Sequence, residues 1–153
     1  MNEAIDNFWQ TARAAVASLP SGGYKIRTFG RSAEMADVLI KLIASGDKTG
    51  TFALAAEYQR NPAQRPVLGD YFVVTHFDGS PALVYRITEV ATVPFRDIGA
   101  KHVAVEGPNA RNVEVWRKIH WPYWGAMLRD WGLPPQEDMA VVFQRFELLY
   151  PEP

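Results

Sequence analysis

Two side chains separated by a short, flexible stretch have the types needed for covalent catalysis: Lys48 and Thr51 in the segment Gly46–Thr51. A threonine hydroxyl is a poor nucleophile unless a base takes its proton during attack, and a desolvated neutral lysine can be that base. Positions three apart on a plain strand face opposite sides, so their convergence requires a turn or bulge, for which Gly50 supplies the backbone freedom. The alternative is an ordinary solvated loop between a helix and a strand, and the spacing alone leaves both interpretations open.

Glu106 follows small and apolar residues in the segment 104–107. A buried carboxylate there requires a cationic partner such as Lys48, whereas an exposed one is an ordinary acid at the end of a helix. The run from Gly46 to Thr49 resembles the end of a phosphate-binding loop only superficially. Lys41 stands where that motif requires its first glycine, so we reject a nucleotide site of this type.

The chain has no cysteine, which excludes disulfides, thiolate metal sites and a cysteine nucleophile. Its three histidines, His76, His102 and His120, show no metal-binding spacing and are interpreted as ordinary surface or core-edge residues. We therefore expect neither a metal nor a cofactor.

Composition indicates a single folded domain spanning residues 1–153, with 48% hydrophobic and 22% charged residues. The net charge of −1 gives no general attraction to nucleic acid, although 11 of the 16 cations are arginines, which suit local anion contacts. Glu3 and Asp6 precede any apolar run, so we expect no signal peptide, and no apolar run approaches the ~20 residues of a membrane span. We expect a cytoplasmic protein without a membrane partner.

Hydrophobic periodicity and turn residues predict the elements that must position these side chains. Helices are expected over residues 3–18, 32–46 and 110–131, the last kinked or split by Pro122. Strands are expected over 25–30, 51–58, 71–77, 82–93 and 139–150, with a hairpin at Asp78–Gly79. The fold class is therefore α+β, with a curled sheet or small barrel. Aromatic residues of the last helix would form core, or alternatively stack on bases.

The ordered series of motifs resembles the ASCH domain family over roughly residues 26–150. The family signature, Gly-x-Lys-x-x-Thr or a close relative, is present as Gly46, Lys48 and Thr51. The other matching segments are Leu68–Asp70, Val93–Ile98, Ala104–Gly107, Trp116, His120 and the strand Val141–Tyr150. The resemblance implies a PUA-like fold, a small β-barrel or pseudo-barrel with helices around an open cleft, preceded here by the N-terminal helix.

Small stand-alone ASCH proteins include amidohydrolases that remove acyl groups from the exocyclic amine of cytosine nucleosides. The resemblance carries their catalytic set onto Lys48, Thr51 and Glu106, with Thr51 attacking the acyl carbonyl and Lys48 as its base. Glu106 would hold the lysine and help to protonate the departing amine. Arg27 and Tyr58 are the expected substrate contacts, and the partner would be a modified pyrimidine base or nucleoside.

Two alternatives remain open. The family has also been regarded as an RNA-binding module and includes a ribonuclease acting on single-stranded RNA. That function would use the same cleft, with phosphate contacts from Arg27, Arg86, Arg111 and Arg117. A sensor that binds a small ligand without turnover is the other alternative. Ala56 stands where relatives often have an aromatic residue, which leaves the choice of substrate open.

Overall fold

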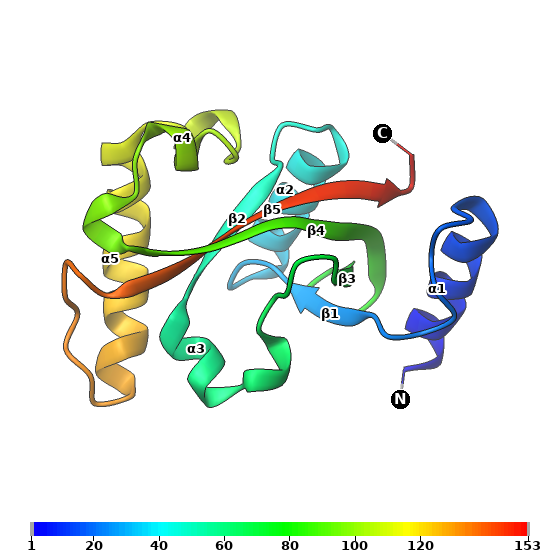
Figure 1. The fold of residues 1–153 in the computed structure, drawn as a ribbon, viewed down its shortest axis with the longest axis horizontal. Coiled ribbons are helices and arrows are strands. Elements are labelled where there is room, and N and C mark those ends of the chain that lie inside the picture. Colours follow the sequence, from blue (N-terminus) through cyan, green and yellow to red (C-terminus); the bar gives the residue numbers. More distant parts are fainter. Residues whose placement is uncertain (1, 153) are drawn as a thin grey trace.

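The structure, a computed structural model, describes residues 2–152 and consists of one mixed five-stranded sheet with helices around it (Figure 1). The strands are β1 (Lys25–Thr28), β2 (Gly50–Leu54), β3 (Tyr71–Thr75), β4 (Pro81–Pro94) and β5 (Ala140–Tyr150). The α-helices are α1 (Glu3–Ala15), α2 (Ala33–Ala44), α3 (Ala55–Arg60), α4 (Ala100–Val103) and α5 (Val113–Asp130). Single 3₁₀ turns occupy Pro62–Gln64, Phe95–Asp97 and Pro108–Ala110.

The sheet has the strand order β1-β3-β4-β5-β2, in which only the β1–β3 pair is parallel. The long strands β4 and β5 form its centre, and their pairing shifts register twice, between Val84 and Tyr85 and between Ile87 and Glu89. Irregularities of this kind increase local twist and bend a sheet. The result is a curled half-barrel of PUA-like α+β type, as the sequence predicted.

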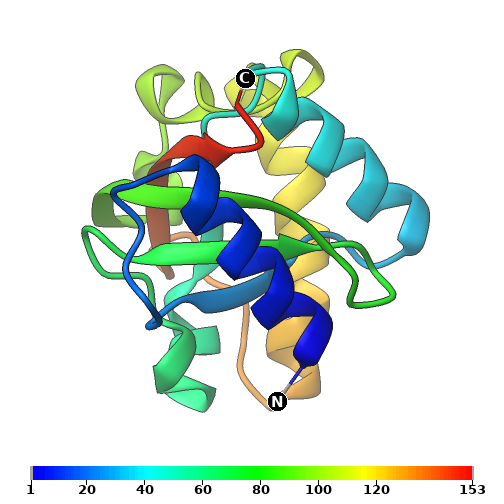
Figure 2. The same cartoon turned by 90° about the vertical axis from the view of Figure 1, so that its right-hand side faces the viewer.

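Helices cover the sheet because successive residues of a strand face opposite sides. In β3, Phe72 and Val74 pack with α2, whereas Val73 packs beneath Trp9 of α1. At the far end of the molecule α5 packs its aromatic face on β2 and β5. Figures 1 and 2 show α1 and α5 at opposite ends of the sheet. None of the helices described between residues 2 and 152 is long and apolar enough to cross a bilayer.

Three sequence predictions of local structure were wrong. The segment 51–58 is a strand only as far as Leu54, and α3 begins at Ala55. The residues of α3 include two alanines, Glu57 and Arg60, which have high helix propensity, so the chain turns into a helix once β2 has crossed the sheet.

The long helix α5 is not split at Pro122 and runs continuously to Asp130. Fully buried Trp116 and nearly buried Trp124 anchor it on both sides of the proline. Proline removes the hydrogen bond to the carbonyl four residues earlier, that of Lys118, which is exposed and can bond to water. Trp121 is half-buried and packs on Phe95, so the aromatic residues of this helix serve mainly as core.

Gly50 is required by close packing, and not by the turn or bulge that the spacing of Lys48 and Thr51 suggested. Its φ is not positive, and β2 pairs with β5 without a register shift. A Cβ atom at this position would lie 2.3 Å from the backbone oxygen of Gln144 and 2.8 Å from the side chain of Val105.

We therefore expect Gly50→Ala to lower the free energy of unfolding by about 1–3 kcal/mol, because backbone atoms of β5 would have to move. Urea unfolding followed by circular dichroism measures this change. The matched control is Gly22→Ala, where a Cβ would have no atom within 4 Å and φ is not positive. Equal stabilities of the two variants would contradict this account of Gly50.

Candidate active site

A cavity of about 660 Å³ opens between the curled sheet, α2, α3 and α5. The five residues predicted as site residues, Lys48, Thr51, Glu106, Arg27 and Tyr58, all line it. They come from β1, the loop after α2, β2, α3 and the loop after α4, so only the fold brings them together.

Backbone hydrogen bonds fix the position of Lys48. The helix α2 ends at Ala44, and Gly46, two residues later, is in the left-handed conformation with φ of 85°. The N–H of Lys48 then donates to the carbonyl of Leu42 at 2.9 Å, and that of Thr49 donates to the carbonyl of Val105 at 2.8 Å. These bonds tie the loop after α2 to the segment that carries Glu106.

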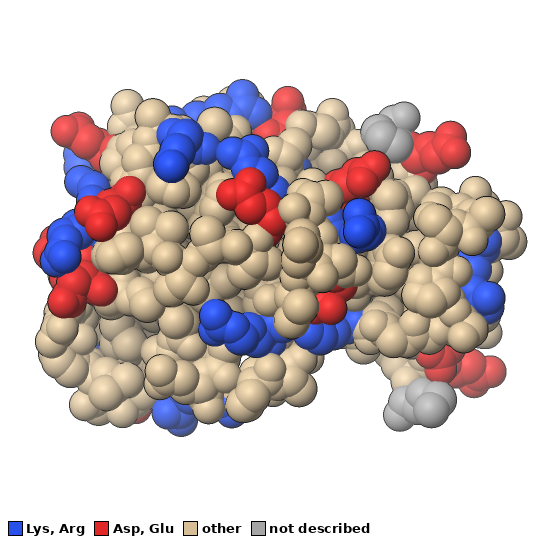
Figure 3. Space-filling model, viewed as in Figure 1, with Lys and Arg blue, Asp and Glu red and all other residues tan. Residues whose placement is uncertain are grey.

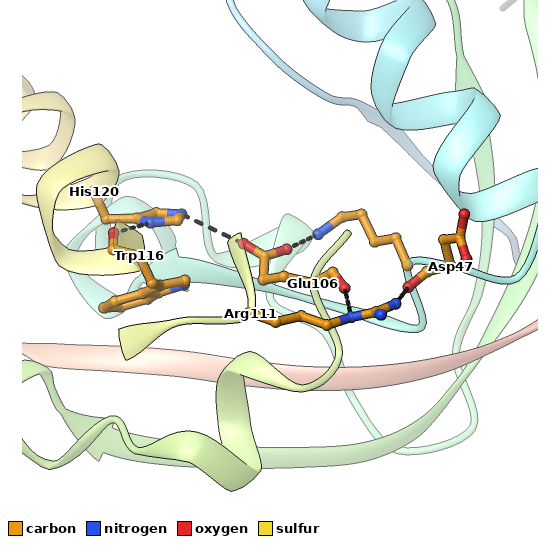
Figure 4. A network of polar contacts seen from close by, with 6 residues as sticks. Asp47, Glu106, Arg111, Trp116 and His120 are labelled. Atoms are coloured by element: carbon orange, nitrogen blue, oxygen red, sulfur yellow. Dashed lines mark hydrogen bonds and ion pairs between the residues drawn. The ribbon is translucent and has the colours of Figure 1, made fainter. Parts of the chain in front are cut away.

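Lys48 and Glu106 form a buried ion pair through Nζ and Oε1 (Figure 4). The two residues are only 4% and 7% exposed. This excludes the interpretation of Glu106 as a solvated helix-end acid, and it identifies Lys48 as the cation that a buried Glu106 requires.

Arg111 joins the two loops that carry this pair. Its Nε donates to the backbone carbonyl of Glu106 at 2.9 Å, and its Nη2 donates to the backbone carbonyl of Asp47 at 2.7 Å (Figure 4). Asp47 directly precedes Lys48, so one guanidinium sets the separation of the two loops. Sequence reasoning had assigned Arg111 to phosphate contact and missed this positioning role.

The surroundings of Lys48 favour its neutral form more than water does. Burial lowers the pKa of its ammonium, the positive charge of Arg27 acts in the same direction, and the Glu106 carboxylate opposes both. The net shift is downward. A larger fraction of Lys48 is therefore available as a base at a given pH than for a lysine in water.

Thr51 lies on β2 and is 6% exposed. It is paired with Gln144 of β5 and lines the cavity with Lys48 and Glu106. Because Lys48 precedes the first residue of β2, the alternation of side chains along a strand does not govern its direction. Lys48, in the loop, and Thr51, in the strand, can therefore both line the same cavity although they are three residues apart.

A second polar group lies in the cavity around Arg27. Its Nη1 donates to Oε1 of Gln144 at 3.3 Å, and its guanidinium lies 4.6 Å from the centre of the Phe29 ring. Within residues 2–152 no carboxylate oxygen lies within 4.0 Å of this guanidinium. Its other polar neighbours are the hydroxyls of Tyr58 and Tyr85, so its charge is not neutralised by a carboxylate in direct contact.

Glu57 faces the same region and was missed by the sequence analysis. It lines the cavity beside Tyr58, because both belong to α3. Burial raises the pKa of the Glu57 carboxyl, and the charge of Arg27 opposes this shift. Had a helix been predicted over residues 55–60, it would have indicated that Glu57 lies on the same short helix as Tyr58, next to the cavity.

His120 was interpreted as an ordinary core-edge histidine, but it lines the cavity and lies close to the ion pair. Its Nε2 is 4.0 Å from Oε2 of Glu106, and its Nδ1 is 2.8 Å from the backbone carbonyl of Trp116 (Figure 4). The i, i+4 relation of His120 to Trp116 was visible in the sequence, but the approach to Glu106 was not.

Charge on the molecular surface is mixed. On the face drawn in Figure 3, Lys and Arg are interspersed with Asp and Glu and form no broad region of one sign. Of the four arginines expected to contact phosphates, only Arg27 lines the cavity. Arg117, like Arg111, donates to a backbone carbonyl, that of Arg96 at 2.8 Å. Across residues 2–152, no group of three His, Asp or Glu side chains is arranged to hold a metal ion.

Comparison with known proteins gives one family. The model of the ASCH domain matches residues 25–150. The crystal structure of an ASCH domain from Lactobacillus crispatus JV V101 is 25% identical, with a TM-score of 0.87 over 98% of this chain and 96% of that one. A protein from Enterococcus faecalis V583 is 26% identical, with a TM-score of 0.85 over 97% of this chain and 89% of that one.

A third solved structure, of a hypothetical protein, shares the fold, with a TM-score of 0.55 and 15% identity over 82% of this chain and 97% of that one. No curated protein matches the sequence significantly.

The ion pair predicts a specific pattern of stabilities. Glu106→Leu leaves the Lys48 charge buried without its partner, and we expect a loss of about 3 kcal/mol in the free energy of unfolding. The double variant Lys48→Met/Glu106→Leu removes both charges and should recover most of that loss. Urea unfolding measures both.

The exposed pair Glu89–Arg145, at 3.0 Å, provides the control. There Glu89→Leu should cost less than about 1 kcal/mol, since solvent screens the partner. A double variant no more stable than Glu106→Leu would show that the two charges are not coupled.

Proposed function

Because this chain belongs to the ASCH domain family, which is associated with RNA-binding and hydrolase roles, we propose that it is an amidohydrolase acting on N(4)-acylated cytosine or cytidine. It removes the acyl group from the exocyclic amine. The observation that carries the proposal is the buried Lys48–Glu106 pair in the same cavity as Thr51. A lysine with a lowered pKa that shares a cavity with a threonine hydroxyl provides the base and the nucleophile that nucleophilic acyl transfer requires.

In the first half of the reaction, Oγ of Thr51 forms a bond to the acyl carbon while its proton passes to Nζ of Lys48. The bond between the acyl carbon and N4 then breaks, and the Lys48 ammonium returns that proton to N4. The free cytosine amine leaves, and the acyl group remains on Thr51 as an ester. Glu106 holds Nζ in position and stabilises the ammonium that forms between the two steps.

The region around Arg27 suits the pyrimidine. Guanidinium N–H groups can donate to the O2 and N3 acceptors of the base, and the ring of Tyr58 lines the same cavity. The Glu57 carboxyl adds an acceptor for the remaining N4–H. This combination of donors and acceptor fits an acylated cytosine better than a plain carboxylic amide, which offers no such edge.

RNA binding or single-strand cleavage is the competing function. It is supported less well, because two of the arginines it requires are held by backbone carbonyls and the surface carries no broad basic region in the view of Figure 3. Binding that weakens steeply with salt would be its signature.

Substitution of the proposed nucleophile and base tests the function. Purified protein should release cytosine or cytidine from its N(4)-acetyl form, and chromatography measures this release. We expect Lys48→Met to lower kcat/KM by about 10²–10⁴-fold and Thr51→Ala by at least as much. The double variant should be little worse than either one, because such residues act as a unit.

The chain offers close controls. Thr49 is exposed and two residues from Thr51, and Lys41 is exposed on α2, so Thr49→Ala and Lys41→Met should retain activity. If folded wild-type protein leaves acylated cytosines intact while it binds or cuts single-stranded RNA, the amidohydrolase proposal is wrong.

The pH dependence follows from the lowered pKa of Lys48. Protonation of Nζ removes the base, so kcat/KM should fall as pH falls, with an inflection below the ordinary lysine value of 10.5. A pH–rate profile on acetylcytidine measures it. A rate that rises as pH falls through this range would contradict the role of Lys48 as a base.

A further inference from the structure

His120 has a defined tautomer in this structure. Its Nδ1 lies 2.8 Å from the backbone carbonyl of Trp116. A carbonyl oxygen only accepts hydrogen bonds, so Nδ1 carries a hydrogen and donates it. In the neutral ring Nε2 then has a free lone pair, and this is the nitrogen that faces the Glu106 carboxylate.

Aromatic neighbours hold the ring in place. His120 stacks on Trp116 with ring centroids 4.3 Å apart and an interplanar angle of 23°, and its other neighbours are Trp124 at 4.7 Å and Phe52 at 6.1 Å. Burial lowers the pKa of His120, and the charge of Lys48 acts in the same direction. The Trp116 carbonyl and the charge of Glu106 oppose this shift without reversing it. Together these contacts favour the neutral form of the ring.

The distance between Nε2 and Oε2 of Glu106 is 4.0 Å. Two acceptors face each other here, and the distance exceeds that of a direct hydrogen bond. A water molecule in contact with both atoms would donate one hydrogen to Nε2 and the other to the carboxylate, which is a usual bridge between polar groups more than ~3.5 Å apart.

Resting on the proposed amidohydrolase function, we infer that His120 is a second catalytic base, which activates a water molecule held between Nε2 and Glu106 to hydrolyse the acyl ester on Thr51. The first half of the reaction leaves this ester, and its release needs a water with a base beside it. Lys48 is in contact with Glu106 on the carboxylate's other oxygen, Oε1, so the two oxygens of Glu106 serve the two halves of the reaction.

The step balances as follows in atoms and protons. A water proton passes to Nε2 of His120 while the water oxygen forms a bond to the acyl carbon. The bond between that carbon and Oγ of Thr51 breaks. The proton on Nε2 moves through Glu106 and Lys48 to Oγ, which restores the hydroxyl, and the carboxylic acid leaves and ionises in solvent.

A His120→Gln variant separates the two halves. With acetylcytidine we expect one equivalent of cytidine per protein to be released in a burst, after which turnover falls by about 10²–10⁴-fold. Mass spectrometry of the intact protein, and of the peptide containing Thr51, should show one acetyl group on Thr51. His76→Gln is the matched control, since the His76 side chain is 41% exposed and lies outside the cavity, and it should turn over like wild type without an adduct.

A purely structural role of His120 would not respond to chemical rescue. Added imidazole should restore deacylation to His120→Ala and remove the acetyl group from its Thr51, with no effect on His76→Gln. If His120→Gln does not fold, as judged by circular dichroism, His120→Asn takes its place in the burst experiment.

Two results would overturn the inference: wild-type turnover in a folded His120 variant, or loss of the burst and the turnover together without an adduct. Failure of the proposed function looks different, because wild-type protein would then release no cytidine, or Thr51→Ala would release it as fast as wild type.

Discussion

The buried ion pair between Lys48 and Glu106 is the interaction on which the site depends. Removing two charges from water costs several kcal/mol for each ion, and their attraction offsets this only when the geometry is held closely. The fold provides that geometry through backbone contacts: Thr49 bonds to Val105 one residue before Glu106, and Arg111 bonds to the carbonyls of Asp47 and Glu106. Because of this desolvation cost, a buried ion pair adds little to the free energy of unfolding, and a chemical role accounts for it better than a stabilising one.

The same constraint organises the rest of the cavity. Gly50 lets β2 pack closely on β5 and Val105, and the next residue, Thr51, lines the same cavity as the pair. On the other side α5 places His120 within 4.0 Å of the Glu106 carboxylate. The carboxylate thus lies between a lysine and an imidazole, and the lowered pKa of each has burial as its largest cause. The helix α5 continues through Pro122, and this keeps Trp116 and His120, before the proline, packed together with Trp124, after it.

Local structure was predictable where local physics decides it. The helix α2 begins after the Ser32 cap, whose side chain accepts from the N–H of Met35, and it ends just before the left-handed Gly46, because capping and periodicity are encoded within a few residues. The hairpin at Gly79, with φ of 90°, is another such case. By contrast, β2 ends at Leu54, where its pairing with β5 stops at Val141, and α3 begins at Ala55. Nothing in the alternation of residues 51–58 marks this point.

By itself the sequence determined the α+β class, most element positions, the family and the residue types available for chemistry, because these depend on composition, short-range periodicity and ordered motifs. It left open whether Lys48 was solvated, whether Glu106 was buried, and whether His120 was anything more than a core-edge residue. Those questions concern distances between residues far apart in the chain, 58 positions for the Lys48–Glu106 contact. Only the tertiary structure decides them, since burial and electrostatic neighbours, which set the pKa of a side chain and the use it can have, exist only once the sheet has curled and α5 has closed the cavity.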